Sequence, residues 1–123
     1  ILYAIRIRVI ELFTSKKVIC DRYLLDTELD LIINFPEENI KRWFLWSALV
    51  LLSKKPQAHF ILTIPVSESQ IRSIEKGEPF PDSKDVLEKR LSLYLHHCKA
   101  PGYIHLNGLE SKDLLLERIL KNL

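Results

Sequence analysis

The sequence predicts an α/β fold in which helices flank a parallel sheet. Short runs with β-branched and aromatic residues, at 17–20, 59–64 and 103–106, alternate with longer helical patterns. The segments between these runs are long enough to hold crossover helices, and such connections join parallel strands. Hydrophobic residues make up 47% of the 123 residues and charged residues 28%, which is typical of a globular chain of about one domain.

The N-terminal part begins with a predicted helix. Apolar side chains recur at helical spacing over residues 1–15, although alternation within 5–9 leaves a strand as the rival interpretation. Residues 17–20 are predicted to form a short buried strand. Residues 21–36 mix acidic and apolar side chains, and we assign no element to them.

The middle of the chain is predicted to form a helix and then a buried strand. The helix extends from about Glu37 to Ser53, because the lysines and the proline of 54–56 favour a helix end there. The content of β-branched and aromatic residues predicts a strand at 59–64, which Pro65 ends.

The C-terminal half is predicted to hold three helices and one more strand. Gly77 follows the first of these helices, where a glycine often ends a helix, and the two prolines of 78–82 exclude a helix there. Serine or aspartate at a helix start can cap its free backbone N–H groups. The predicted elements are a helix from Ser67 to Lys76, a loop at 78–82, a helix capped by Asp82 or Ser83 and ending near Cys98, a strand at 103–106 ended by Asn107-Gly108, and a final helix capped by Ser111.

Charge and cysteine content limit the classes of function. The net charge of +2, from 18 basic and 16 acidic residues, is too even to favour nucleic-acid or membrane binding by bulk electrostatics. Cys20 and Cys98 lie far apart and are predicted to be reduced thiols, the first as a small core residue of its strand. No segment resembles a signal peptide, and the apolar run 43–52 is too short to span a bilayer. We therefore expect a cytoplasmic protein.

Asp21 and Arg22 directly follow the predicted strand at 17–20. Ligands of open α/β sheets bind beyond the carboxyl ends of the strands. A carboxylate at that edge can hold a metal ion or its waters, and a guanidinium can bind a phosphate through two hydrogen bonds. The alternative is an exposed turn with a local ion pair.

Together with Tyr23 these residues form an Asp-Arg-Tyr motif, and residues 18–23 resemble the strand and motif of thymidylate kinases and thymidylate-kinase-like proteins. Four further segments resemble, in order, the next core strand of that family, its lid, the Arg-x-x-x-Tyr helix after the lid and the final strand with the loop that packs on adenine. These segments are 59–65, 67–79, 87–94 and 103–108.

The resemblance covers nearly all of the chain and implies a P-loop nucleoside monophosphate kinase-like fold. Residues 1–123 would form a single partial domain, with the lid at about 67–82. The sequence has three glycines and no GxxxxGK[ST] loop, and it begins at Ile1 inside a helical pattern. We therefore expect an N-terminal portion carrying the phosphate loop to be missing.

The resemblance also implies roles for single residues. Asp21 would lie near Mg²⁺ and the phosphates, and Arg22 would hold the phosphate of the acceptor. Arg72 or Lys76 would close over the transferred phosphoryl group, whose charge needs cations around it; for these two the alternative is a solvated helix face. The implied catalytic residues are Asp21, Arg22, Arg72 and Lys76; the substrate-binding residues are Arg22, Tyr23, Asp26, Thr27 and Asp30; Asn107 and Gly108 would contact ATP; and Asp21 would hold the metal.

The function predicted from this resemblance is transfer of the ATP γ-phosphoryl group to a nucleoside monophosphate, with thymidine monophosphate as the indicated acceptor. Thymidylate kinases usually read thymine with a Gln after the motif, but residues 24–30 contain none, and their carboxylates also suit a hydroxylated substrate or a metal. The alternatives are a non-catalytic α/β interaction domain that keeps the fold, and a P-loop kinase for another small metabolite.

Other candidates have ordinary interpretations. His96 and His97 are adjacent on a predicted helix and point about 100° apart, so they do not easily share one metal ion. His59 and His105 lie in predicted strands and are interpreted as core or edge groups. Arg90 is interpreted as a surface charge paired with Asp85 or Glu88. Trp43, Phe44 and Trp46 make one helix strongly apolar, which favours core packing or, as the alternative, a homodimer interface.

Overall fold

The computed structural model describes residues 6–7, 9–10, 13 and 18–123. The chain divides into two compact units, residues 1–55 and residues 56–123, which we call the N-terminal unit and the C-terminal unit. The described residues before 18 are helical, in agreement with the prediction, and the other residues of the predicted segment 1–15 lie outside the described residues.

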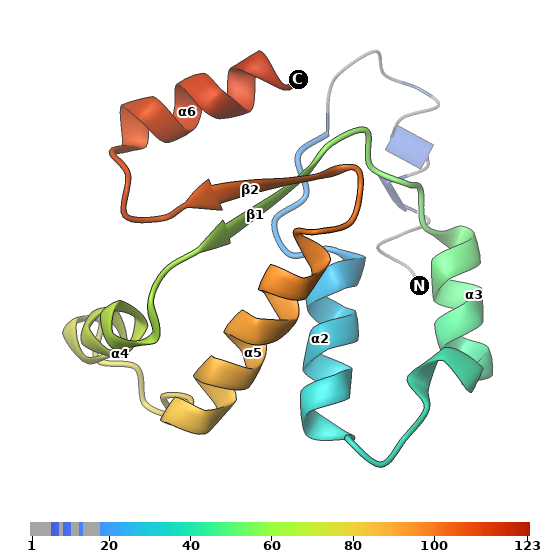
Figure 1. Cartoon of the computed structure of the whole chain (residues 1–123). Coiled ribbons are helices and arrows are strands. Elements are labelled where there is room, and N and C mark those ends of the chain that lie inside the picture. The colour runs from blue at the N-terminus through green and yellow to red at the C-terminus, as the bar shows by residue number, and fades with distance from the viewer. Residues whose placement is uncertain (1–5, 8, 11–12, 14–17) are drawn as a thin grey trace. The chain divides into compact units, whose positions relative to one another are not determined.

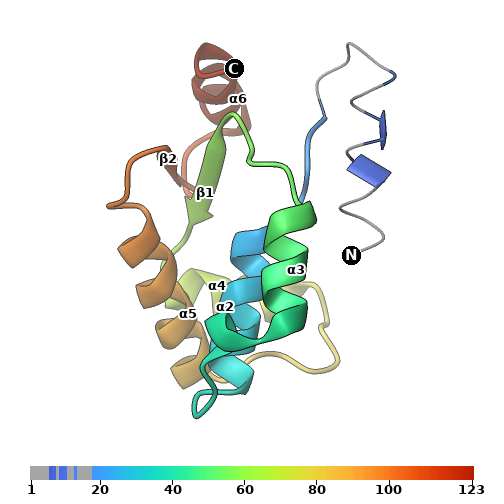
Figure 2. The ribbon, with the colours of Figure 1, turned by 90° about the vertical axis from the view of Figure 1, so that its right-hand side faces the viewer.

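The N-terminal unit contains α2 (Leu24–Asn34), the 3₁₀ turn η1 (Ile40–Arg42) and α3 (Phe44–Leu52). The two α-helices run in opposite directions and are joined by the segment that holds η1 (Figures 1 and 2). Leu29 of α2, Ile40 of η1 and Trp46 of α3 are buried, so each element contributes one side chain to the core of this unit.

Residues 18–20 do not form the predicted strand. They have no regular secondary structure, and the side chains of Val18 and Ile19 are 37% and 85% exposed. A strand is stabilised by hydrogen bonds to a neighbouring strand, and in the described residues the only paired strands are two in the C-terminal unit. Cys20 is accordingly half-buried in an irregular segment and is a free thiol.

Two further predictions for this unit need correction: the start of the helix at 37–53 and the place of Trp43 within it. The predicted helix 37–53 begins only at Phe44, because the chain turns at 36–38 and forms η1, which buries Ile40. Trp43 is extended, with φ −71° and ψ 130°, and its ring lies edge-on to Phe35 with a centroid separation of 6.0 Å. Tertiary packing of these side chains therefore outweighs the helical pattern of the sequence.

Helix α2 was not predicted, although its apolar residues recur at helical spacing. The signal that is missing is a usual capping residue, because Tyr23 occupies the N-cap position. Asp26, three residues into the helix, supplies the cap instead: the Tyr23 backbone N–H donates to its Oδ2 at 3.2 Å.

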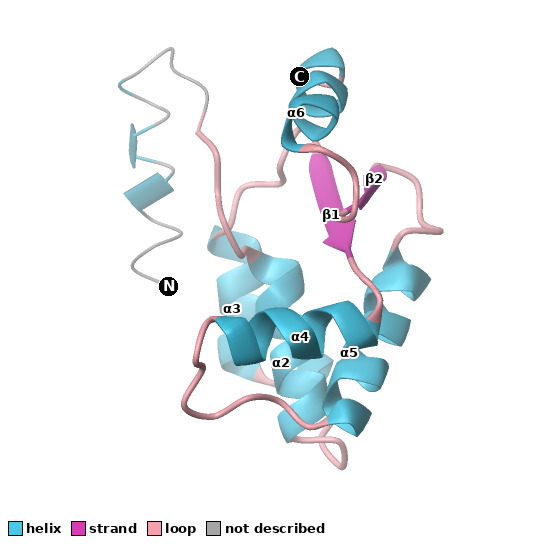
Figure 3. Cartoon of the chain, turned by 90° about the vertical axis from the view of Figure 1, so that its left-hand side faces the viewer, coloured by secondary structure: helices cyan, strands magenta, loops and turns pink. Residues whose placement is uncertain are grey.

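The C-terminal unit contains β1 (His59–Thr63), α4 (Val66–Glu75), α5 (Lys84–His97), β2 (Tyr103–Asn107) and α6 (Lys112–Lys121). The two strands pair in parallel, with His59 opposite Tyr103 and Thr63 opposite Asn107. Figure 3 shows this pair among its helices. The structure thus confirms a mixed α/β fold with a parallel sheet and flanking helices, although the described sheet has two strands where three were predicted.

Most element boundaries of this unit agree with the sequence prediction. Ser83 and Ser111 cap α5 and α6, and each hydroxyl accepts a backbone N–H at 3.4 Å. The N-cap of α4 lies two residues earlier than predicted, at Pro65 rather than Ser67. Ile61 and Leu106 are 5% and 2% exposed, and these two strand residues form the core of the unit.

Candidate functional site

Arg22 has an unusual backbone conformation. Its φ is +54°, in the left-handed region that residues other than glycine rarely adopt, and it is the only non-glycine residue with positive φ in the described part of the chain. Asp21 and Arg22 are both exposed. No hydrogen bond or ion pair joins either side chain to another described residue. The local ion pair that was the alternative explanation of these two residues is therefore not formed.

The residues after Arg22 hold the start of α2 together. The Tyr23 carbonyl accepts the Thr27 N–H at 3.3 Å and lies 3.4 Å from the Thr27 hydroxyl, which donates to it. The Tyr23 phenol donates to the Lys54 carbonyl at 3.1 Å and so ties this helix start to the segment after α3. Tyr23, Asp26 and Thr27, which were predicted to bind the substrate, thus have structural partners of their own.

Asp30 lies one helical turn after Asp26, so both residues lie on the same face of α2. Both are half-buried, and the Asp30 carbonyl accepts the Asn34 side-chain N–H at 2.7 Å. The structure therefore brings six predicted site residues into one stretch of the N-terminal unit. It places Asp21 and Arg22 before a helix rather than after a strand, so the predicted position at a sheet edge is wrong for them.

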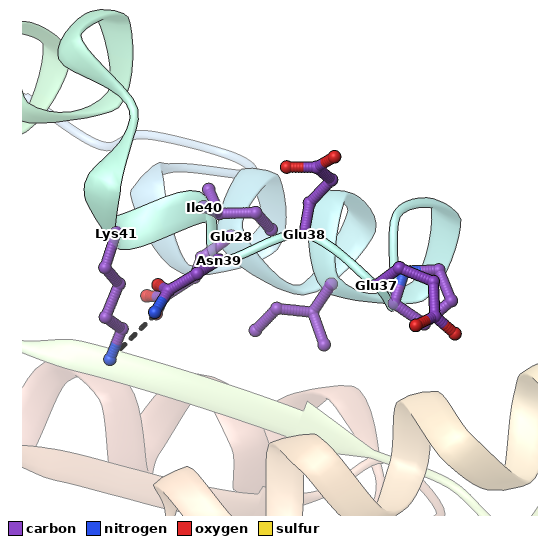
Figure 4. Close-up of a pocket in the computed structure, with 8 residues that line it drawn as sticks. Glu28, Glu37, Glu38, Asn39, Ile40 and Lys41 are labelled. Carbon is purple, nitrogen blue, oxygen red and sulfur yellow. Dashed lines mark ion pairs between the residues drawn. The ribbon is translucent and has the colours of Figure 1, made fainter.

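A pocket of about 380 Å³ opens between the second half of α2 and the segment that leads into η1 (Figure 4). Ile32, Pro36 and Ile40 supply its apolar lining, and the Glu28 carboxylate lies 3.5 Å from Lys41 Nζ at its rim. Sequence reasoning missed this pocket, and it contains none of the predicted site residues. Its remaining lining residues are Glu37, Glu38 and Asn39.

The predicted lid consists of α4 and the loop after it. Arg72 donates through Nε to Glu68 one turn earlier at 2.7 Å, so its guanidinium is already engaged within the helix. Lys76 is exposed at the end of α4. Gly77 follows with φ +64°, and the Glu78 N–H returns to the Ser73 carbonyl at 3.1 Å, which completes a glycine-terminated helix end. Of the two lid cations, only Lys76 forms no ion pair with another described residue.

The Asn107-Gly108 segment lies directly after β2. Its backbone is held to β1, because the Gly108 N–H donates to the Thr63 carbonyl at 2.8 Å. Asn107 uses its side-chain oxygen to accept the Leu109 N–H at 3.1 Å. A Cβ added at Gly108 would lie 2.6 Å from Ile64 Cγ2, so only glycine fits at this point. This segment follows the carboxyl end of a parallel strand, the edge at which ligands of α/β sheets bind.

Two of the histidines, His59 and His97, pack against Tyr103. The His59 and Tyr103 rings are 4.7 Å apart and the His97 and Tyr103 rings 6.0 Å apart. Burial lowers the pKa of His59 and raises the pKa of the Cys98 thiol. Among the described residues no group of three His, Cys, Asp or Glu side chains is placed to hold a metal ion. Arg90 pairs with Asp82 at 3.4 Å, an acidic residue that was not predicted as its partner.

The predicted site residues fall into two groups, and each unit holds one of them. Comparison of the chain with protein-family models, with curated proteins and with solved structures finds no match. No helix in the described part of the chain is both long enough and apolar enough to cross a membrane.

Proposed function

We propose that this chain belongs to a nucleotide-kinase-like phosphotransferase, which moves the γ-phosphoryl group of ATP to a nucleoside monophosphate. The observation that carries the proposal is Arg22, whose guanidinium is exposed and unpaired among the described residues. Its left-handed backbone costs conformational energy, and strain of this kind persists where the surrounding structure maintains it, often at functional sites. The P-loop kinase-like fold that the motif implies is part of the same proposal.

In this proposal Arg22 binds the phosphate of the acceptor nucleotide. A guanidinium can donate two parallel hydrogen bonds to phosphate oxygens. The start of α2 directly follows Arg22 and carries the positive end of the helix dipole, which also favours an anion. Two independent sources of positive potential therefore support the placement of one phosphate at residues 21–24.

Asp21 fits the role of a magnesium ligand. Its carboxylate is exposed and has no partner among the described residues. Mg²⁺ commonly keeps several waters and takes one or two carboxylates together with substrate phosphates, so one carboxylate is a sufficient protein contribution. When bound, the ion would neutralise charge on the phosphates. Asn107 and Gly108 would contact the ATP base, and Lys76 is the lid cation available for the transferred group.

The acceptor is proposed to be thymidine monophosphate first and another small phosphate acceptor second. Tyr23, Asp26 and Thr27 stabilise the start of α2, so they would shape the acceptor site mainly by fixing the position of Arg22. Asp30, on the same helical face as Asp26, is proposed to contact acceptor hydroxyls. The 123 residues contain no GxxxxGK[ST] loop, so catalysis requires that loop elsewhere in the protein.

A phosphoryl-transfer assay tests the proposal. The protein is produced from its complete coding sequence and incubated with ATP, Mg²⁺ and each nucleoside monophosphate in turn, and formation of the diphosphate is measured. We expect turnover with thymidine monophosphate that requires Mg²⁺ and is lost on replacement of Asp21 by Asn. Absence of transfer to every acceptor, from a protein that is folded by circular dichroism, would overturn the proposal.

One observation favours a second function, that of an interaction module. In α3 the side chains of Phe44, Leu45 and Leu51 are 83%, 66% and 78% exposed, so one helix carries several exposed large apolar side chains. A second copy of the chain is the partner proposed for this face, in line with the homodimer alternative. Sedimentation velocity on the complete protein and on its Leu51→Glu variant tests it: a dimer that the charge dissociates supports the module, and a monomeric wild type rejects it.

A further inference from the structure

Thr63, the last residue of β1, is held by two residues of the following β2 segment. Its hydroxyl oxygen lies 2.7 Å from His105 Nε2, and its carbonyl accepts the Gly108 N–H at 2.8 Å. Asn107 lies between these two residues in sequence and is opposite Thr63 in the strand register. The chain on both sides of Asn107 is therefore fixed to a single residue of β1.

The hydrogen bond between Thr63 and His105 contributes little to the core. His105 is exposed, and water can replace an exposed hydrogen bond at small net cost. The buried strand residues are Ile61 and Leu106 instead. Thr63 and His105 thus form an exposed polar pair that bridges the two strands. The pair lies next to the loop at the carboxyl edge of those strands, where a ligand could reach it.

The loop beside the pair has little freedom of its own. The missing Cβ of Gly108 lets the backbone pack against Ile64 and the end of β1, and the Asn107 side chain is bound to the Leu109 N–H. The position of the Asn107-Gly108 segment thus depends on Thr63, and the hydroxyl of Thr63 is oriented by His105. The rings of His59 and His97 each contact the ring of Tyr103.

We infer that His105 is a positioning residue for an adenine nucleotide, which acts by holding Thr63 and, through it, the Asn107-Gly108 segment. This inference rests on the proposed function, because that function makes the segment the contact for the ATP base. His105 itself need not touch the nucleotide. Its loss should weaken nucleotide binding without altering the acceptor site of the N-terminal unit.

Isothermal titration of ADP with Mg²⁺ into the complete protein tests the inference. We expect His105→Ala and Thr63→Val each to weaken ADP binding about tenfold, the effect of losing one positioning hydrogen bond. Thr63→Ser keeps the hydroxyl and should bind ADP as the wild type does. The double variant His105→Ala/Thr63→Val should be no weaker than either single variant, because both remove the same interaction. His96→Ala, an exposed histidine of α5, is the matched control and should leave the affinity unchanged.

The outcomes separate this inference from the proposed function. Tenfold weaker binding with rescue by Thr63→Ser and an unchanged acceptor KM supports the positioning role. An ADP affinity that stays at the wild-type value in His105→Ala contradicts the inference and leaves the proposed function standing. Equal weakening in the control His96→Ala also contradicts it, because the loss would not be specific to the pair. A wild type that binds no ADP overturns both.

Discussion

The two units hold their candidate sites by different means. In the C-terminal unit the Asn107-Gly108 segment is anchored on a pair of strands, through a backbone hydrogen bond and a contact too close for any residue but glycine. In the N-terminal unit Arg22 precedes a helix whose first turn is held by side chains, with Asp26 as its cap. The difference indicates that a site on paired strands tolerates few substitutions, whereas the site before α2 depends on a few local hydrogen bonds that can be removed singly.

Core truncations should have the largest effects and should show whether the units unfold independently. Leu29 is 0% exposed in the N-terminal unit and Leu106 is 2% exposed in the C-terminal unit. Replacement of either by Ala should lower the free energy of unfolding by about 2–5 kcal/mol. Denaturant titration should show each substitution shifting the transition of its own unit. Leu62→Ala, at a side chain that is 56% exposed, is the control; an equally large loss there would contradict the burial assigned to these strands.

Gly108→Ala should have the next largest effect. The added Cβ would lie 2.6 Å from Ile64 Cγ2 and 3.2 Å from the Thr63 carbonyl oxygen, so the loop must move. We expect a loss of about 1–3 kcal/mol, as for overpacking in a core, and weaker ADP binding in the complete protein.

Gly102→Ala is the matched comparison for Gly108→Ala. Its φ is +90° and no atom lies within 4 Å of the added Cβ, so it carries backbone strain without a clash. Thermal unfolding compares the two variants, and an equal loss in both would mean that close packing does not hold the Asn107-Gly108 segment.

Asp26→Ala tests the local construction of the N-terminal site. It removes the acceptor of the Tyr23 N–H and should lower the free energy of unfolding by about 0.5–2 kcal/mol, as for loss of a helix cap. Asp21→Ala removes an exposed carboxylate that caps nothing and should leave stability unchanged. Chemical denaturation distinguishes the two. An Asp26→Ala protein of wild-type stability but with a higher KM for the acceptor would assign Asp26 to substrate binding instead.

The smallest expected effect is on the pH dependence of the C-terminal unit. Burial lowers the pKa of His59 below its ordinary value of 6.5, so the unfolded chain binds the proton more readily than the folded one. The stability from neutral His59 is therefore complete above that value and is lost as the pH falls through the lower, folded pKa. His59→Phe keeps a ring against Tyr103 and should flatten this part of a stability–pH curve. A curve that is unchanged in the variant would contradict the role of His59.

The sequence predicted those elements whose signals are local. Ser83 and Ser111 are usual capping residues, Gly77 marks a helix end, and β-branched residues mark β1, so these boundaries are nearly correct. Residues 18–20 were misassigned because strand formation depends on a partner elsewhere in the chain, which composition alone does not supply. Helix α2 was missed because its N-cap is a tyrosine.

The same distinction holds for the candidate site. The Asp-Arg-Tyr motif is read directly from the sequence, and the structure places its residues together at the start of a helix. The positive φ of Arg22 and the engagement of Arg72 by Glu68 depend on conformation, and no motif predicted them. The pocket beside η1 depends on the turn at 36–38, where the sequence favoured a continuous helix, and was missed for that reason.

The most direct test of the central claim is the acceptor dependence of an Arg22→Ala variant of the complete protein. Loss of a hydrogen bond to a charged group costs about 1.5–3 kcal/mol, so kcat/KM for the acceptor should fall roughly tenfold to a hundredfold. The KM for ATP should remain near its wild-type value, and Arg22→Lys should recover part of the activity because it keeps the charge but loses the planar fork. Arg42→Ala, at an exposed arginine of the same unit, should behave as wild type. An Arg22→Ala protein with wild-type acceptor kinetics would contradict the account and make residues 21–23 a structural turn.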